Sequence, residues 1–242
     1  MAIVLFTDFG SNDLYVGQVE AALDRDAPGT RVIHLLHDAP KFNPRASAHL
    51  LAALVSRLPG RHVYMAVVDP GVGSERGAVA VHAEGSWFVG PDNGLLSVVA
   101  ARAADCEVWR MIDRPSGMST SFHGRDLFAP IAAALATGRS PRDVAVRAEA
   151  LAEALGGDDL AEVVYVDHYG NAFTGIRAAA VATSRRLVFR GRRIDHADVF
   201  SAVAPGAAFW YANSLGLVEI AVNSGSAARV LELVFGDPVG WA

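Results

Sequence analysis

The chain has 242 residues, of which 52% are hydrophobic and 19% are charged, a composition typical of a packed globular protein and not of a disordered one. Its formal net charge of −5 lacks the strong positive balance of nucleic-acid-binding proteins, so no nucleic acid partner is expected. The single cysteine, Cys106, excludes an intrachain disulfide and a cysteine-based zinc site, and it favours a cytoplasmic location.

Strands and helices alternate along the first part of the chain, which is typical of an α/β domain with a parallel sheet. No basic leader precedes the acidic Asp8, so the amino end predicts a core strand and not a secretion signal. Asn43 and Pro44 are expected to be the N-cap and the first residue of a helix. The predicted strands are residues 3–7, 31–36, 62–68, 78–83 and 86–90, and the predicted helices are residues 14–23, 43–58, 94–103 and 126–138.

The composition changes after residue 136. Residues 137–159 are rich in alanine, glycine, arginine and acids, and they predict a helical connector at a domain boundary. Short β-like segments follow, at residues 161–176, 185–191, 215–223 and 228–236. We therefore expect a Rossmann-like α/β domain at residues 1–150 and a small carboxyl-terminal β-barrel domain at residues 160–242. Pro205 and Gly206 interrupt the longest uncharged stretch, so no membrane span is expected.

Three loops combine acids or bases with glycines, although a turn explains any one of them without a function. These loops are residues 8–13, 69–76 and 122–126. Asp69, Arg76 and His123 supply an acid, a fixed cation and a titratable base. Asp8 and Asp69 follow the first and third predicted strands, and ligands bind at such strand ends in open α/β sheets. The loops together predict a catalytic site.

Other kinds of site are less well supported. Asp8, Asp13, Asp69, His123 and Asp126 are possible ligands of a divalent ion, but the chain has no HxxxH or HxH pair and no calcium-type loop, so no metal is expected. A GxSxG serine nucleophile and a GxGxxG dinucleotide turn are also missing from the sequence. We predict an enzyme without a cofactor.

Aromatic residues near polar loops offer a place for a purine, although core packing is the ordinary role of such residues. They are Phe42, Tyr169, Phe173, Phe209, Trp210 and Tyr211. Tyr169 lies near Asn171, and Tyr211 lies near Asn213 and Ser214, and an asparagine amide can pair with an adenine edge. The residues alone thus predict an α/β enzyme with an additional β domain that binds a small, nucleoside-like molecule.

Six motifs, in this order, resemble those of the S-adenosylmethionine (SAM) hydroxide adenosyltransferase family, the SAM hydrolases related to fluorinases and chlorinases. The resemblance covers nearly the whole chain. The motifs are Thr7-Asp8-Phe9-Gly10, Asp69-Pro70-Gly71-Val72-Gly73, Gly90-Pro91-Asp92-Asn93-Gly94, Phe122-His123-Gly124-Arg125-Asp126, residues 167–171, and Asn213-Ser214 with Gly225-Ser226-Ala227-Ala228.

The resemblance implies an α/β domain, a β-barrel and a homotrimer whose active sites lie between one subunit's first domain and its neighbour's second. It implies that Asp8 holds the ribose hydroxyls and that Phe42 lines the ribose pocket. Asn171 and backbone near Ala227 are then expected to read adenine. Asp13, Asp167 and Ser214 are expected to face the methionine end, where carboxylates suit an ammonium group and a sulfonium cation.

The halogenating relatives lack the acid, arginine and histidine set of the hydrolytic members, and this chain has it in Asp69, Arg76 and His123. The resemblance therefore implies attack by water or hydroxide at ribose C5′, with adenosine and methionine as products. Two alternatives stay open from the sequence: a non-catalytic SAM or adenosine sensor, and a halide-using adenosyltransferase, although Val72, Asp69 and Arg76 do not suit a halide pocket.

Overall fold

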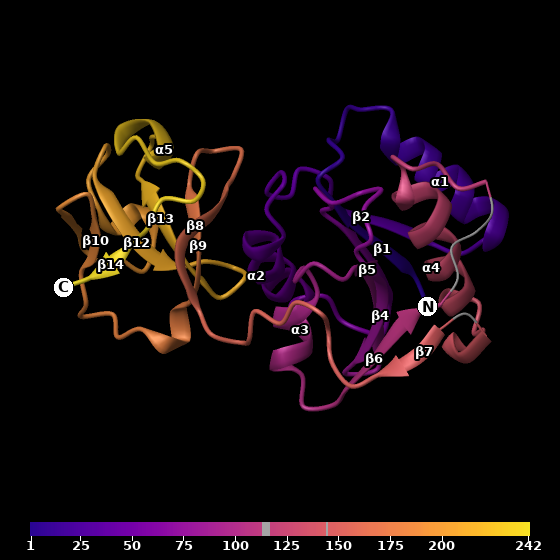
Figure 1. Cartoon of the computed structure of the whole chain (residues 1–242). Helices are drawn as coiled ribbons and strands as arrows, with labels where there is room; N and C mark the ends of the chain where they lie inside the picture. Colours follow the sequence, from indigo (N-terminus) through magenta and orange to yellow (C-terminus); the bar gives the residue numbers. More distant parts are fainter. Residues whose placement is uncertain (113–116, 144) are drawn as a thin grey trace. The chain divides into compact units, whose positions relative to one another are not determined.

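The computed structural model describes residues 1–112, 117–143 and 145–242. The chain divides into two compact units: residues 1–48 with 59–157 form the first, and residues 49–58 with 158–242 form the second. Their helices and strands are labelled in Figure 1. Within the described ranges, no helix combines the length and the hydrophobicity needed to cross a membrane.

A seven-stranded sheet, as far as the structure describes it, forms the centre of the first unit, in the order β2-β1-β3-β5-β4-β6-β7. Neighbouring strands run parallel from β2 to β5 and antiparallel from β5 to β7, so the sheet is mixed, whereas the sequence predicted a parallel one. The strands are β1 (Ile3–Thr7), β2 (Val32–Leu36), β3 (Val63–Val67), β4 (Ala78–Ala83), β5 (Ser86–Pro91), β6 (Cys106–Met111) and β7 (Ala145–Ala148).

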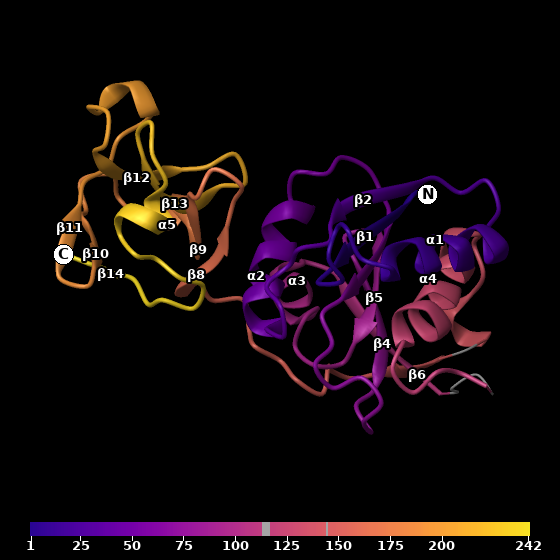
Figure 2. The ribbon, with the colours of Figure 1, turned by 90° about the horizontal axis from the view of Figure 1, so that it is seen from above.

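Helices cover both faces of this sheet. Figures 1 and 2 show α1 and α4 on one face and α3 on the other. The helices of the first unit are α1 (Tyr15–Asp26), α3 (Ser97–Arg102) and α4 (Ala129–Ala136), with a π-helical turn at Gly124–Phe128 and a 3₁₀ turn at Pro141–Asp143. Helix α2 (Pro44–Val55) begins in the first unit and continues into the second. Asn43 caps α2 as predicted, because its Oδ1 accepts a hydrogen bond from Ala46 N at 2.9 Å.

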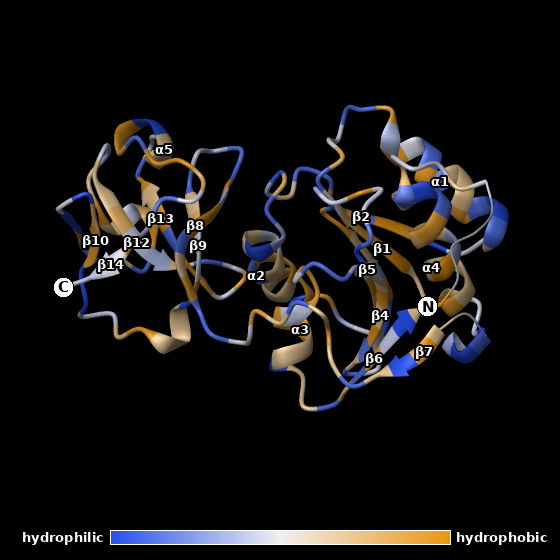
Figure 3. Cartoon of the chain, in the orientation of Figure 1, coloured by the Kyte–Doolittle hydropathy of each residue, from blue (hydrophilic) through white to orange (hydrophobic). Residues whose placement is uncertain are grey.

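The core of the first unit lies between the sheet and the helices α1 and α4. Every residue of β1 and β3 is buried, which is typical of strands covered on both faces. Figure 3 shows this as hydrophobic colour along β1, β4 and β5. Val19 and Leu23 of α1 pack with Phe128 and Leu135 against this layer. The buried strands hold the loops at their ends in place.

The second unit contains two antiparallel sheets, with strand orders β12-β13-β9-β8 and β11-β10-β14. Its strands are β8 (Leu160–Val166), β9 (Ala172–Arg177), β10 (Leu187–Phe189), β11 (Arg192–Ile194), β12 (Ala208–Ala212), β13 (Leu217–Val222) and β14 (Gly240–Trp241); its short helices are the 3₁₀ turns Ala178–Ala180 and Phe200–Ala202 and the α-helix α5 (Ala227–Val230). The structure describes two separate antiparallel sheets and not a closed barrel, so the barrel stays a prediction.

Two expectations about local structure are wrong. Residues 137–159 do not form a helical connector: they contain the 3₁₀ turn and strand β7, which pairs with β6. The alanines suggested a helix, but Gly138 and Pro141 break one, and β6 offers an edge to pair with. Residues 228–236 are not a strand, because Ser226 caps α5 by accepting a hydrogen bond from Arg229 N at 3.3 Å.

Candidate active site

Two aspartates follow neighbouring parallel strands of the first sheet. Asp8 comes directly after β1, and Asp69 follows β3 by two residues. The backbone N–H of Asp8 donates to Val67 O at 3.3 Å, which joins the two strand ends. The sheet therefore brings both carboxylates to the edge where α/β proteins bind ligands.

Arg76 joins Asp69 and His123. Its Nε donates to Asp69 Oδ1 at 2.7 Å, and its Nη2 donates to Asp69 Oδ2. The same Nη2 lies 3.0 Å from His123 Nδ1, and Nη1 donates to Gly77 O at 2.8 Å. The three residues nominated by the sequence are thus in direct contact, although 47 positions separate Arg76 from His123.

These contacts fix the protonation state of the imidazole. A guanidinium only donates hydrogen bonds, so His123 Nδ1 accepts one from Arg76 and carries no proton. In this arrangement His123 is the neutral tautomer with its proton on Nε2. His123 is 2% exposed, and the side chains of Asp69 and Arg76 are 5% and 11% exposed. In such a dry setting the hydrogen bonds are strong and the partners are costly to separate.

Glycines allow the loops around this group to approach closely. Gly73 has a φ of +83°, and a Cβ there would lie 2.6 Å from Thr120 O. A Cβ at Gly124, which directly follows His123, would lie 2.8 Å from the ring of Phe9. The Arg76 guanidinium packs over the Phe128 ring at 5.2 Å. Larger residues at the two glycines would move the loops that carry Arg76 and His123.

A cavity of about 400 Å³ opens beside this group. Three of its wall residues are acids, Asp8, Asp13 and Asp69, and the rest are mostly aromatic or small. The lining residues are Asp8, Phe9, Gly10, Asp13, Tyr15, Lys41, Phe42, Asp69, Val72, Ser121 and Phe122. This acidic wall suits a cationic ligand. We call this space the acidic cavity.

Asp8 is destabilised as an anion in this wall. Burial raises the pKa of its carboxyl group, and the charge of Asp69 raises it further, against a hydrogen bond from the backbone of Phe42. Phe42 N donates to Asp8 Oδ2 at 3.3 Å, and Phe42 itself has a φ of +58°. The Phe42 side chain is 76% exposed at the cavity rim. A bound cation or hydroxyl donor would favour the ionised Asp8.

Of the three contacting residues, Asp69 borders the acidic cavity, whereas Arg76 borders a neighbouring cavity of about 520 Å³. That second space also contacts Arg45, Asn93 and Glu153 of the same unit. His123 lines neither cavity. Asp69 is therefore the member that a ligand in the acidic cavity can reach.

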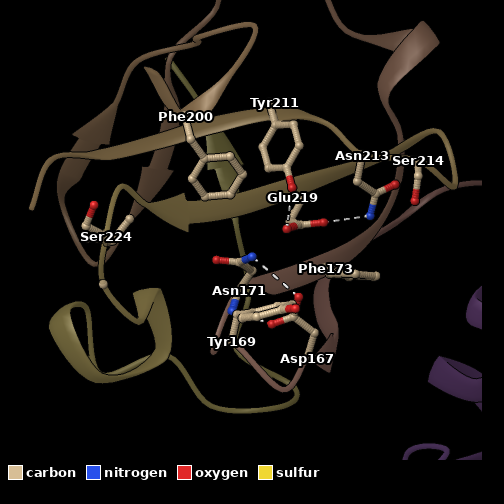
Figure 4. Close-up of a pocket in the computed structure, with 12 residues that line it drawn as sticks. Asp167, Tyr169, Asn171, Phe173, Phe200, Tyr211, Asn213, Ser214, Glu219 and Ser224 are labelled. Carbon is tan, nitrogen blue, oxygen red and sulfur yellow. Dashed lines mark hydrogen bonds between the residues drawn. The ribbon is translucent and has the colours of Figure 1, made fainter. Parts of the chain in front are cut away.

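A third cavity, of about 760 Å³, lies within the second unit, and Figure 4 shows its residues. We call it the amide cavity, because two asparagine side chains lie in its wall. Five residues expected from the sequence to bind substrate line it together with the aromatic Phe200 and Tyr211. The predicted residues in the wall are Asp167, Tyr169, Asn171, Asn213 and Ser214, the last two being neighbours in the chain.

The turn between β8 and β9 places Asn171. Asp167 N donates to Asn171 O at 3.0 Å, and Asn171 N donates to Asp167 Oδ1 at 2.8 Å. Gly170, with a φ of +85°, completes the turn, and Tyr169 projects from it with 76% of its side chain exposed. Asn171 is 6% exposed, so this turn holds its amide in a fixed place beside the cavity.

The sequence did not nominate Glu219, which is 2% exposed in the wall of the amide cavity. Tyr211 OH donates to its Oε1 at 2.6 Å, and Asn213 Nδ2 donates to its Oε2 at 3.0 Å. Burial raises the pKa of Glu219, as does the charge of Asp167. In the sequence, the feature that points to Glu219 is its place as the single acid in the apolar run of β13, LVEIAV.

Some nominated residues lie elsewhere. Trp210 and Phe209 are each 1% exposed, and Trp210 packs on Trp241, so both belong to the core and not to a purine site. Ala227 is fully buried at the start of α5 and does not line the amide cavity. Among the described residues, no group of three or more His, Cys, Asp or Glu side chains is arranged to hold a metal ion.

Known sequences match the chain over nearly its whole length. The pattern of the SAM hydroxide adenosyltransferase N-terminal domain matches residues 3–145, and that of the C-terminal domain of the same family matches residues 161–240. A protein of Thermus thermophilus named (R)-S-adenosyl-L-methionine hydrolase is 40% identical, over 98% of either chain. Its namesake from Salinispora arenicola is 38% identical, over 96% of this chain and 94% of the relative.

Solved structures match the fold as well. The crystal structure of an uncharacterized conserved protein from Thermotoga maritima aligns with a TM-score of 0.89 and 32% identity, over 99% of this chain and 100% of the other. That of a conserved hypothetical protein from Thermus thermophilus aligns with a TM-score of 0.80 and 35% identity, over 100% of this chain and 99% of the other.

Proposed function

The chain belongs to the SAM hydroxide adenosyltransferase family, and from this premise we propose how it hydrolyses (R)-S-adenosyl-L-methionine to adenosine and methionine. The observation that carries the proposal is Arg76, which donates hydrogen bonds to Asp69 and to His123 beside an acidic cavity. This group suits the activation of one water molecule.

The reaction is a displacement at the ribose C5′ carbon. An O–C5′ bond forms and the C5′–S bond breaks, and its electron pair stays on sulfur. Sulfonium departs as a neutral thioether, so no acid is needed for its departure. The difficulty is the poor nucleophilicity of water, which the site overcomes by holding the molecule in line and easing its deprotonation.

We propose that Asp69 accepts the proton of the attacking water. His123 Nδ1 already accepts from Arg76, and Asp69 is the residue of the three that borders the acidic cavity. The Arg76 cation stabilises hydroxide relative to water, because an opposite charge nearby favours the charged form. His123 accepts a hydrogen bond from Arg76 Nη2 and so helps to hold the guanidinium in place.

The acidic wall also serves the substrate. Asp8, Asp13 and Asp69 place negative charge where a sulfonium cation would bind, and charge neutralisation during attack gains from a dry site. We assign Asp8 to the ribose hydroxyls, Phe42 to the ribose wall and Asp13 to the methionine end. These roles follow the family resemblance and the position of each residue in the cavity wall.

The amide cavity supplies the remaining groups in this proposal. Asn171 and backbone near Ala227 read adenine, with Tyr169 and Asn213 beside them, and Asp167 and Ser214 face methionine. We further propose a homotrimer in which residues 1–150 of one subunit and the β-rich residues 160–242 of its neighbour share a site. The cytoplasmic location stays a prediction.

The test is hydrolysis in water enriched in oxygen-18. The purified protein is given separated (R) and (S) diastereomers of SAM, and the products are analysed by chromatography with mass spectrometry. Adenosine that carries the heavy oxygen on C5′, formed from the (R) diastereomer, is the expected result. Label in methionine, or no product, would contradict the mechanism.

The same assay separates the rival functions. A sensor would bind SAM tightly and release no adenosine. A halide-using enzyme would form 5′-halo-adenosine faster than adenosine when chloride is added. A metal-dependent enzyme would lose activity after thorough chelation, whereas we expect full activity in the chelated sample.

A further inference from the structure

Glu219 lies where an acid contributes little to stability. It belongs to β13, in which all six residues are buried, and its neighbours along the strand are apolar. A carboxylate at such a position costs free energy unless hydrogen bonds compensate for the lost water. Folding therefore does not explain the presence of an acid at this position, and its contacts in the amide cavity suggest another role.

The Glu219 carboxyl group organises the side chains around it. Tyr211 OH and Asn213 Nδ2 donate to its two oxygens. The Asn213 carbonyl meanwhile accepts from Leu215 N and Leu217 N, both at 3.0 Å, so this amide has one possible orientation. Asn213 is therefore a structural link between Glu219 and the β12–β13 turn.

Asn171 is oriented by two acids. Its Nδ2 donates to Asp167 Oδ2 at 3.4 Å, and its side chain lies near enough to Glu219 to lower the pKa of that carboxyl group, against the effect of burial. A flipped amide would point its carbonyl oxygen at the two carboxylates, which is repulsive. In Figure 4 the carbonyl oxygen of Asn171 lies on the side away from the Asp167 carboxylate. It thus faces a ligand as an acceptor only.

We propose that Glu219 is a positioning residue that, together with Asp167, keeps the Asn171 carbonyl oxygen toward the ligand and so makes the site select a purine carrying an amino group. An acceptor binds the 6-amino group of adenine and repels the 6-oxo group of hypoxanthine. The proposal rests on the proposed function, because it takes the adenosyl group to bind in the amide cavity. A site with a fixed polar partner rejects the wrong partner more strongly than an apolar site does.

Glu219→Gln tests this role. The new amide can donate to the Asn171 carbonyl, so both orientations of Asn171 become acceptable while size is kept. Adenosine and inosine, which differ only at position 6, are used as competitive inhibitors of SAM hydrolysis. We expect the wild type to bind adenosine at least about 30-fold more tightly than inosine, and Glu219→Gln to bind the two within about threefold.

A merely structural role would change stability and kcat but not this ratio. We expect kcat of Glu219→Gln to stay within about threefold of the wild type while KM rises, because ground-state binding is what changes. Glu232→Gln is the matched control in the same unit, since the Glu232 side chain is 85% exposed. It should keep the wild-type ratio.

Asp167→Asn is the second variant, for use if circular dichroism shows that Glu219→Gln does not fold. It removes the other acid that orients Asn171, and the nucleoside ratio should again fall. A folded variant that keeps the wild-type ratio overturns the role of Glu219 while leaving the hydrolase function intact. A wild-type protein that makes no adenosine overturns the function itself.

Discussion

Arg76 uses the flat shape of its guanidinium as well as its charge. The three nitrogens of the planar guanidinium reach Asp69, Gly77 O and His123, with distances of 2.7–3.0 Å for three of the contacts. A lysine has one nitrogen and cannot make this set. We expect Arg76→Lys to lower kcat on the order of 10²-fold, because the charge stays but the water and Asp69 lose their alignment.

Steady-state kinetics on SAM measure this effect, with KM expected within about threefold of the wild type. Arg193→Lys, at an exposed position of β11, is the matched control. Retention of the wild-type kcat in Arg76→Lys would mean that charge alone suffices and that the fork geometry plays no part.

In the proposed site, the charge of Asp8 serves ribose binding and lowers the stability of the folded protein. The pKa of Asp8 in the folded protein lies above its ordinary value because of burial and the nearby Asp69, so at neutral pH the ionised group opposes folding. We expect Asp8→Asn to raise the melting temperature at pH 7 and to raise KM about tenfold or more, since a charge-assisted hydrogen bond to the ribose is lost.

Thermal denaturation across pH provides the check. The stability advantage of Asp8→Asn should shrink as pH falls through the folded pKa of Asp8, because the wild-type carboxyl group is then neutral as well. A variant that is less stable than the wild type at pH 7 would show that the Asp8 charge supports the loop.

Some site residues could be predicted from the sequence and others could not. Asp69, Arg76 and His123 lie in glycine-containing loops, where a polar residue suggests chemistry, and the structure does bring them into contact. Glu219 lies inside a strand, and which face it points to depends on pairing with β9 and β12. Trp210 was one of the aromatic residues considered for a purine site, but the pairing of its strand turns its ring into the core.

The ends of β1 and β2 carry a chain of hydrogen bonds that the predicted mechanism does not use. Thr7 Oγ1 lies 2.8 Å from His37 Nδ1, His37 Nε2 lies 2.7 Å from His34 Nδ1, and His34 Nε2 lies 2.9 Å from Glu20 Oε1. Asp38 and Glu20 are the acids that act on His37. Gly10 N also donates to His37 O at 2.7 Å, so this chain braces the loop that begins with Asp8.

The contribution of this hydrogen-bond chain to stability should fall in acid. Burial lowers the pKa of His37 below its ordinary 6.5, and His34 lowers it further. The unfolded chain therefore binds a proton on His37 at a higher pH than the folded protein does, and stability is lost as pH falls below 6.5 toward the folded pKa. We expect His37→Asn, whose oxygen can still accept from Thr7, to lose less stability over this range.

Urea denaturation at several pH values measures the difference in unfolding free energy. At pH 8, where His37 is neutral in both states, the two proteins serve as each other's reference. Parallel pH profiles for the wild type and His37→Asn would contradict the assignment to this histidine.

At the level of elements, the sequence predicts best what local chemistry decides. The α2 start at Asn43 and Pro44 and the β4–β5 hairpin follow from a cap and a short turn. Strand β7 depends instead on a distant partner, since Ala145 and Arg147 pair with Met111 and Trp109. An alanine-rich segment has no local signal for such pairing, so its helix propensity gave the wrong prediction.

The two sets of candidate residues lie in different units of the chain. Asp69, Arg76 and His123 belong to the first unit, whereas Asn171 and Glu219 belong to the second. Phe42 and Tyr169, one from each unit, are each 76% exposed in the single chain, which is unusual for ligand-contacting aromatics. In the proposed homotrimer, a neighbouring subunit would cover such rings.

Mixing two inactive variants tests whether subunits share the site. Arg76→Lys damages the first unit and Asn171→Ala the second, and each variant alone should have little activity. In a cyclic trimer that contains both variants, about one site in three combines an intact first unit from one chain with an intact second unit from the next. Co-expression and purification through two different affinity tags, which keeps mixed trimers alone, should therefore restore about a third of the wild-type activity per site.

Light scattering on the purified mixture gives the number of chains in each particle, and separately purified variants mixed just before the assay are the control without subunit exchange. A site built within one chain gives no restoration, because every chain in the mixture carries one damaged unit. Restored activity therefore requires sites shared between subunits. A particle with the mass of three chains but no restored activity would mean that the trimer forms and that each subunit works by itself.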